Sequence, residues 1–168
     1  MVNIALVGCN GKMGKAVTSA VQSRNDCEIV FGADPFGTPA YDYPVFESLA
    51  VSDKKADVII DFSNPASLDD ILAYALEKKI PCVLCTTGYS PEQVEKIKKA
   101  SESVAVFYSG NMSLGINLLI ELSKEAAKIL GAADFDIEIV EKHHNQKIDA
   151  PSGTALMIAD GISDTLAE

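Results

Sequence analysis

Residues 2–14 are VNIALVGCNGKMG, and this stretch decides the fold of the first part of the chain. The run Val2–Val7 is apolar and contains β-branched residues, which is typical of a buried strand. Three glycines follow closely, and from Met13 the apolar residues change to helical spacing. We therefore expect a strand that passes through a tight glycine turn into a helix over residues 13–23.

Strand-like and helix-like segments continue to alternate as far as residue 107. We expect strands at 28–33, 57–62, 82–85 and 104–107, helices at 66–79 and 91–101, and a weak helix at 45–51. Buried strands that alternate with helices build right-handed crossovers and a parallel sheet. The sequence therefore predicts an α/β domain with a doubly wound, Rossmann-like parallel sheet.

The pattern changes after residue 107. A polar turn leads into a long helix that we expect at 114–130, and residues 135–140 (FDIEIV) alternate with period two, as in a half-exposed strand. The second segment is too small to bury a core of its own, so we expect it to be the beginning of a second, α+β domain. The predicted domains are residues 1–111 and 112–168.

Composition limits the possible partners. The chain has 168 residues and a formal net charge of -10, with 24 acidic and 14 basic side chains. Nucleic acid and anionic membrane surfaces are therefore poor partners. The N-terminal apolar run is too short to cross a membrane and lacks a basic region and a cleavage site, so we expect a cytoplasmic protein.

The four cysteines are Cys9, Cys27, Cys82 and Cys85. Cys82 and Cys85 form a C-x-x-C pattern on an expected strand, where residues three apart point to opposite faces. No second pair has the spacing of zinc ligands. We expect reduced, inert thiols and no metal site.

The glycine turn, G-x-x-G-x-x-G over Gly8–Gly14, is a variant of the dinucleotide fingerprint whose first interval is one residue longer. Such a turn lets backbone N–H groups approach a pyrophosphate at a helix N-terminus. Asp34 follows 20 residues after Gly14, the distance at which an acid holds the adenosine ribose. Asp34 would repel a 2′-phosphate, and only Lys12 offsets it, so NADH is favoured over NADPH. A plain glycine-rich turn is the alternative.

Two polar stretches, DFSNP at 61–65 and CTTG at 85–88, follow expected strands. Open α/β sheets bind ligands at the carboxyl ends of their strands. The Thr-Thr-Gly hydroxyls and backbone groups could hold a carboxamide, although an ordinary helix-capping turn is an equal alternative.

Residues 141–155, EKHHNQKIDAPSGTA, contain both histidines of the chain. Lys147 is close by, and Pro151 precedes Ser152-Gly153-Thr154, which is typical of a helix start with free N–H groups. An imidazole acid, an ammonium and a helix N-terminus together suit an anionic substrate that must be protonated. A metal site or a structural turn would be the alternatives for the histidine pair.

The stretch HHNQKIDAPSGTA closely resembles the signature of the dihydrodipicolinate reductase family of the diaminopimelate and lysine pathway. The glycine turn, DFSNP, TTG and the turn at 111–113 resemble that family in the same order. The resemblance implies hydride transfer from NADH or NADPH to the ring of a dipicolinate-type dicarboxylate.

The resemblance also implies roles for individual residues. His143 would be the proton donor and Lys147 would assist it. His144, Ser152, Gly153 and Thr154 would bind the substrate and its carboxylate. The cofactor would be bound by Gly8, Cys9, Asn10, Gly11, Lys12, Met13 and Asp34, with Cys85, Thr86, Thr87, Ser109, Gly110, Asn111 and Met112 around the nicotinamide.

Some positions depart from the family pattern. Pro35 stands where a basic residue often holds the 2′-phosphate, Cys85 replaces a glycine, and Met112 replaces a residue that is commonly aromatic. Family members continue beyond the position of Glu168 and form homotetramers through that part, so the resemblance leaves the oligomeric state of this chain unspecified. A dinucleotide-binding module without turnover is therefore the alternative function.

Overall fold

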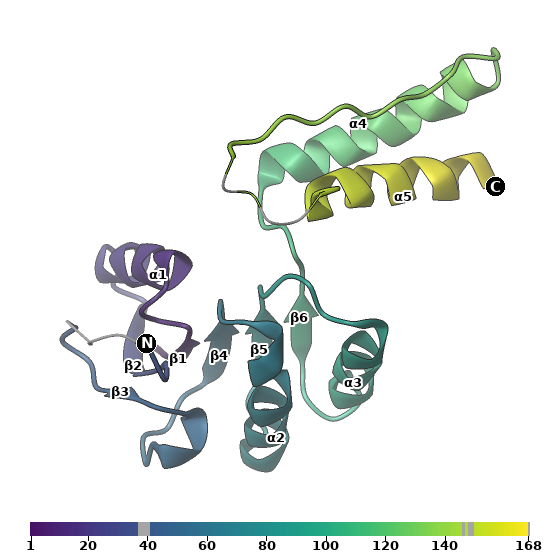
Figure 1. Cartoon of the computed structure of the whole chain (residues 1–168). Helices are drawn as coiled ribbons and strands as arrows, with labels where there is room; N and C mark the ends of the chain where they lie inside the picture. Colours follow the sequence, from purple (N-terminus) through teal and green to yellow (C-terminus); the bar gives the residue numbers. More distant parts are fainter. Residues whose placement is uncertain (37–40, 146, 148–149, 168) are drawn as a thin grey trace. The chain divides into compact units, whose positions relative to one another are not determined.

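The computed structural model describes residues 1–36, 41–145, 147 and 150–167. The chain divides into two compact units, Met1–Gly110 and Asn111–Glu168. Figure 1 shows the first unit in purple to teal and the second in green to yellow.

The first unit contains one parallel sheet with the order β3-β2-β1-β4-β5-β6. Its strands are β1 Val2–Val7, β2 Cys27–Ala33, β3 Val45–Phe46, β4 Val58–Asp61, β5 Cys82–Leu84 and β6 Val106–Tyr108. The chain builds outward from β1 to β3 and then returns to place β4 on the other side of β1 (Figure 1). This order confirms the predicted doubly wound α/β fold, and it puts the reversal point between β1 and β4.

Helices cover both faces of this sheet. They are α1 Lys12–Gln22, α2 Leu68–Lys78 and α3 Pro91–Ser101, with short 3₁₀ turns η1 Leu49–Val51 and η2 Pro65–Ser67. Successive side chains of β1 point to opposite faces. Ile4 and Leu6 belong to the core that includes Val17 of α1, whereas Ala5 and Val7 belong to the core formed with α2 and α3.

The segment at 45–51 differs from the expected weak helix. Val45 and Phe46 pair with Gly32 and Ala33 as the edge strand β3, and only Leu49–Val51 forms a helical turn. Pairing with β2 satisfies the backbone of Val45–Phe46, so the tertiary contact overrides the local pattern.

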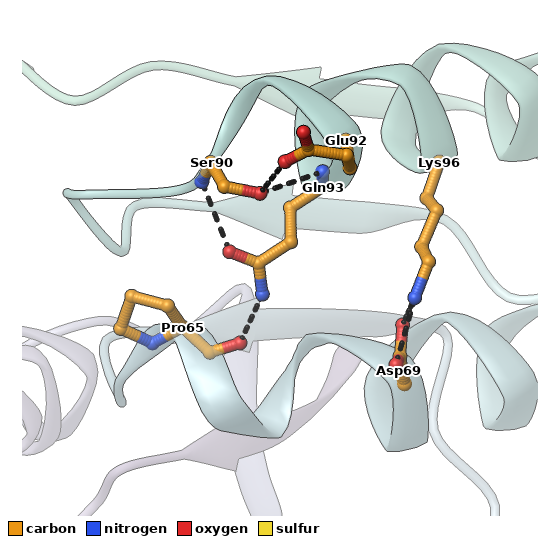
Figure 2. Close-up of polar contacts among 6 residues, drawn as sticks. All are labelled: Pro65, Asp69, Ser90, Glu92, Gln93 and Lys96. Atoms are coloured by element: carbon orange, nitrogen blue, oxygen red, sulfur yellow. Dashed lines mark hydrogen bonds and ion pairs between the residues drawn. The ribbon is translucent and has the colours of Figure 1, made fainter.

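A capping box begins α3, and two further contacts join this helix to the rest of the first unit (Figure 2). The Ser90 side chain accepts a bond from Gln93 N–H at 3.3 Å, and the Gln93 side chain accepts one from Ser90 N–H at 3.0 Å. The amide of Gln93 also donates to the carbonyl oxygen of Pro65 at 2.6 Å. Lys96 pairs with Asp69 of α2. The start of α3 thus holds the segment that follows β4.

The second unit contains α4 Leu114–Gly131 and α5 Gly153–Ala167, which run side by side in the same direction (Figure 1). The helices approach closely at two glycines: a Cβ on Gly131 would lie 2.7 Å from Leu166, and one on Gly161 would lie 3.3 Å from Ile120. None of the helices in the described part of the chain has the length and apolar character needed to cross a membrane.

The prediction of a strand at 135–140 is wrong, because these residues are assigned no strand. A strand requires a neighbour whose backbone groups complete its hydrogen bonds. All strands in the described residues belong to the sheet of the first unit.

Candidate functional site

The glycine turn between β1 and α1 has a geometry that only glycine accommodates at two positions. Gly8 has φ +76°, and a Cβ there would lie 2.5 Å from the carbonyl oxygen of Phe62. A Cβ on Gly14 would overlap the backbone of Gly8 and Cys9. The turn can therefore pass close to the segment after β4 while α1 begins directly against the end of β1.

The start of α1 leaves donors for an anion. Gly11 is the N-cap, and among the described residues no side chain caps this helix end. The first N–H groups of a helix have no partner within the helix, and the dipole favours negative charge there. A glycine-lined turn with such donors fits a pyrophosphate.

Asp34 joins the end of β2 to this turn. Its Oδ2 accepts a 3.0 Å hydrogen bond from Asn10 N–H, and its Oδ1 accepts a 2.9 Å bond from Phe36 N–H. The amide of the Asn10 side chain donates to the carbonyl oxygen of Phe36. These bonds hold Asp34 in place. Because each carboxylate oxygen can accept more than one bond, Asp34 keeps acceptor capacity for ribose hydroxyls.

A cavity of about 550 Å³ lies at the reversal point of the sheet. Four predicted cofactor residues line it: Gly8, Asn10, Gly11 and Asp34. Phe62, Ser63 and Asn64 of the polar stretch after β4 also line it, as expected for the carboxyl end of a strand.

Sequence reasoning missed the other polar residues of the cavity wall. They are Glu47 and Ser48, which follow β3, and Ser67 and Asp70 at the start of α2. Their only sequence signal is their position after a strand or at the start of a helix.

The charged side chains that line this cavity in the described part of the chain are acidic. Three carboxylates line it, those of Asp34, Glu47 and Asp70, and none of the described lining residues is Lys, Arg or His. Lys12 and Met13 are exposed residues of α1 outside the lining, and Cys9 is buried.

Two tyrosines are linked to the glycine turn by hydrogen bonds. The Tyr41 hydroxyl donates a 2.8 Å bond to the carbonyl oxygen of Cys9. Tyr43 stacks on Tyr41 with ring centroids 4.8 Å apart, and its hydroxyl lies 2.8 Å from Thr18 Oγ1. Thr18 in turn donates to the carbonyl oxygen of Gly14. The tyrosine pair, Tyr41 and Tyr43, is therefore linked to both ends of the turn.

A buried carboxylate connects the loops that follow β4 and β5. Asp61 is 0% exposed, and its Oδ1 accepts bonds from the N–H and hydroxyl of Ser63. The Tyr89 hydroxyl donates to Oδ2 at 3.1 Å. Burial, with the nearby Asp61 charge, raises the pKa of Tyr89, so this hydroxyl stays protonated.

The residues predicted around the nicotinamide follow β5 and β6, which are paired strands. Cys85 and Thr86 are buried after β5. Ser109 N–H donates to the carbonyl oxygen of Leu84, and a Cβ on Gly110 would lie 3.6 Å from Thr87. These residues are therefore neighbours at the carboxyl edge of the sheet, whereas the remaining two predicted residues, Asn111 and Met112, belong to the second unit.

All four cysteines are free. Burial raises the pKa of the Cys82 and Cys85 thiols to about 11, with a smaller contribution from the Asp61 charge. Thiolate is the reactive form, so both are weak nucleophiles near neutral pH. No cluster of three or more His, Cys, Asp or Glu suited to a metal occurs in the described part of the chain.

In the second unit, Glu141 brings the predicted proton donor to the start of α5. Its Oε2 lies 2.7 Å from His143 Nε2, and its Oε1 accepts a 2.8 Å bond from Ser152 N–H. The Ser152 hydroxyl also donates to Glu141 and accepts a 3.1 Å bond from Ala155 N–H. The bonds from His143 and then Ser152 lower the pKa of Glu141 to about 2. Sequence reasoning missed Glu141, although it precedes His143 by two residues.

The other predicted substrate residues belong to the same segment. Lys147 is half-buried, and its N–H donates a 3.3 Å bond to the carbonyl oxygen of His144. Gly153 and Thr154 lie in the first turn of α5. A Cβ added at Gly153 would have no neighbouring atom within 4 Å. The polar groups of Ser152 are engaged by Glu141 and Ala155, which favours a positioning role for Ser152 over direct substrate contact.

Comparisons with known proteins agree along the whole chain. Residues 2–112 match the family model described as dihydrodipicolinate reductase, N-terminus, and residues 115–168 match dihydrodipicolinate reductase, C-terminus. The chain is 52% identical over 168 residues to 4-hydroxy-tetrahydrodipicolinate reductase of Clostridium tetani, and 49% identical to that of Caldanaerobacter subterraneus. Each match covers 100% of this chain and 66% of the relative, so the chain spans slightly less than two thirds of their length.

Solved structures give the same result. A dipicolinate-bound dihydrodipicolinate reductase from Paenisporosarcina sp. TG-14 superposes with a TM-score of 0.75 at 30% identity, covering 98% of this chain and 66% of that one. The WlbA dehydrogenase from Chromobacterium violaceum has a TM-score of 0.60 at 18% identity, covering 76% of this chain and 40% of that one, which indicates a shared fold alone. The chain therefore belongs to the dihydrodipicolinate reductase family.

Proposed function

We propose that this protein is an NADH-preferring reductase that converts 4-hydroxy-tetrahydrodipicolinate to tetrahydrodipicolinate. The first unit would supply most of the cofactor residues, whereas the second would supply Asn111, Met112, the proton donor and the carboxylate-binding turn. The observation that carries this proposal is the Glu141–His143–Ser152 group at the start of α5. A module that only bound a dinucleotide would not need an oriented acid beside a helix N-terminus.

The cofactor residues act by binding and orienting. The turn at Gly8–Gly14 offers N–H groups to the pyrophosphate, and Asp34 offers acceptors to the ribose hydroxyls. The absence of Lys, Arg and His among the described cavity-lining residues supports NADH over NADPH. When bound, the reduced nicotinamide supplies the hydride.

The substrate is a dianion, and the second unit has suitable partners for it. The relative from Paenisporosarcina binds dipicolinate, which supports a ring dicarboxylate as ligand. The N–H groups of Gly153 and Thr154 would donate to one carboxylate at the start of α5, and His144 would contact the substrate. Lys147 would balance the negative charge.

His143 would deliver the proton that accompanies hydride transfer. Glu141 orients the imidazole through Nε2, which leaves Nδ1 as the nitrogen available to the substrate. Glu141 also holds Ser152, directly before α5, so one carboxylate fixes both the acid and the carboxylate-binding helix start. Because Glu141 contacts both, the proton donor and the carboxylate-binding turn keep a fixed separation.

Turnover distinguishes this proposal from a binding module. Protein, NADH and 4-hydroxy-tetrahydrodipicolinate are mixed, and the absorbance of the reduced nicotinamide is followed. We expect loss of NADH only when protein and substrate are both present, and competitive inhibition by dipicolinate. Tight NADH binding without substrate-dependent oxidation would identify the chain as a binding module.

A further inference from the structure

We propose that Phe36 is the platform on which the adenine ring of the dinucleotide stacks. This inference rests on the proposed function and deepens it, because it assigns the base-binding residue of the same cavity. Phe36 lines the cavity, yet the residue is 71% exposed. Isolated exposed apolar side chains are common, and Phe36 differs from them in how its backbone is held.

The backbone of Phe36 is fixed on both sides by residues of the dinucleotide site. Its N–H donates a 2.9 Å bond to Asp34 Oδ1, and its carbonyl oxygen accepts a bond from the Asn10 side chain. Both partners also bond to each other through Asn10 N–H and Asp34 Oδ2. The ring of Phe36 is therefore an exposed aromatic group on a positioned backbone.

Its location matches the geometry of an adenosine. Adenine is bonded directly to the ribose, so a base whose ribose is held by Asp34 lies close to that carboxylate. Phe36 is two residues from Asp34 and bonded to it. Aromatic side chains bind bases through their faces without requiring hydrogen bonds to the base.

Aromatic stacking also fits the charges of the cavity. The other residues that line the same cavity include Glu47 and Asp70, which carry carboxylates. These groups offer acceptors to an amino group on the base, whereas Phe36 offers an apolar face. A neutral amino-purine suits both kinds of group, whereas the described charged side chains that line the cavity are acidic and would repel the 2′-phosphate of NADPH.

The chain contains no tryptophan, which permits a direct test. Phe36→Trp introduces the chain's single tryptophan at the proposed stacking position, and Phe107→Trp provides a matched control at an exposed aromatic of β6 outside the cavity lining. Each variant is titrated with ADP and, separately, with nicotinamide mononucleotide. We expect ADP to quench the fluorescence of Phe36→Trp and nicotinamide mononucleotide to leave it unchanged, with no quenching by ADP in the control.

The second measurement is the affinity of the variants for ADP. Because base stacking on an aromatic residue typically changes binding by about 5-fold to 100-fold, Phe36→Leu should weaken ADP binding by that factor, whereas Phe107→Leu should leave it unchanged. Normal ADP affinity in Phe36→Leu, with no quenching of Phe36→Trp, would overturn the platform and leave the reductase proposal intact. ADP quenching in a protein that never oxidises NADH with substrate would support the platform and refute the reductase. Failure of the unmodified chain to bind ADP would overturn the platform, and failure to bind NADH as well would overturn both.

Discussion

The main-chain N–H of Asn10 donates a 3.0 Å hydrogen bond to Oδ2 of Asp34, which joins the phosphate turn to the carboxylate proposed to hold the ribose. Removing this carboxylate should affect NADH more than NADPH. We expect Asp34→Ala to weaken NADH binding by about 10-fold to 100-fold, since hydrogen bonds to a charged group are stronger than neutral ones. NADPH binding should weaken less, because a repulsive charge is also removed.

Calorimetric titration of both cofactors checks this prediction. The unmodified protein should bind NADH at least as tightly as NADPH. A large preference for NADPH that persists in Asp34→Ala would show that the acid does not select the cofactor.

Tyr41 should act as a positioning residue for the phosphate turn. Tyr41→Phe removes one hydroxyl, and with it the bond to the Cys9 carbonyl oxygen, but retains an aromatic ring opposite Tyr43. A neutral hydrogen bond contributes about 0.5–1.5 kcal/mol, so NADH affinity should fall by roughly 2-fold to 12-fold. Fluorescence titration with NADH measures this change.

Tyr43→Phe provides the matched control. It removes the contact with Thr18, but Thr18 keeps its own bond to the Gly14 carbonyl oxygen. We expect a smaller loss of NADH affinity in this variant. Equal affinities for the unmodified protein and Tyr41→Phe would argue against the positioning role.

The capping box of α3 should contribute to stability without affecting the cofactor. Ser90→Ala removes the acceptor for Gln93 N–H and should lower the free energy of unfolding by about 0.5–2 kcal/mol in urea titrations. Ser101→Ala is the control, because its hydroxyl donates to a carbonyl oxygen at the exposed end of the same helix. Similar losses in both variants would show that the cap has no special contribution.

Much of the first unit is predictable because its signals are local. β1 and the glycine turn combine a buried apolar run with conformations that favour glycine, and α3 begins at a Ser-Pro cap. β3 was not predictable, since two residues at 45–46 become a strand only by pairing with Gly32 and Ala33. Period-two alternation at 135–140 predicted a strand, but alternation does not supply the partner that a strand needs.

The candidate site residues also divide into those that a local sequence signal indicates and those whose role depends on contacts between distant positions. Asp34 could be identified by its spacing from Gly14, and His143 by the rare residue types around it. Glu141 could not, because its role arises when the chain brings Ser152, 11 positions later, to its carboxylate. Tyr41 likewise contacts Cys9, 32 positions earlier, and no spacing rule anticipates that bond.

The Glu141 carboxylate should titrate well below ordinary glutamates. Its pKa is lowered from 4.5 to about 2 because the ionised form accepts bonds from His143 and Ser152. The ionised form therefore stabilises the folded state, fully so above about pH 4.5, and this contribution is lost as pH falls toward 2. Carbon NMR of the side-chain carboxyl should give a midpoint near 2.

Ser152→Ala tests the second contribution to that shift, which follows the larger contribution of His143. This variant removes the hydroxyl that donates to Glu141 but keeps the backbone N–H bond. The midpoint should move upward, toward 4.5. A midpoint of 4.5 in the unmodified protein would mean that Glu141 does not hold the start of α5 in solution.

The proposed reductase depends most directly on His143. Loss of a general acid typically lowers the rate by about 10²–10⁴-fold, and its effect should appear in kcat rather than in cofactor binding. Lys147→Ala should also lower kcat, whereas Lys142→Ala, a change at the exposed neighbour of His143, should leave it nearly unchanged.

The decisive measurement is kcat for substrate-dependent NADH oxidation in His143→Ala, taken together with the NADH dissociation constant of the same variant. We predict a fall in kcat of about 10²–10⁴-fold with an unchanged dissociation constant. A near-normal kcat in His143→Ala would contradict the role of His143 as proton donor and would leave the histidine pair as residues of a structural turn.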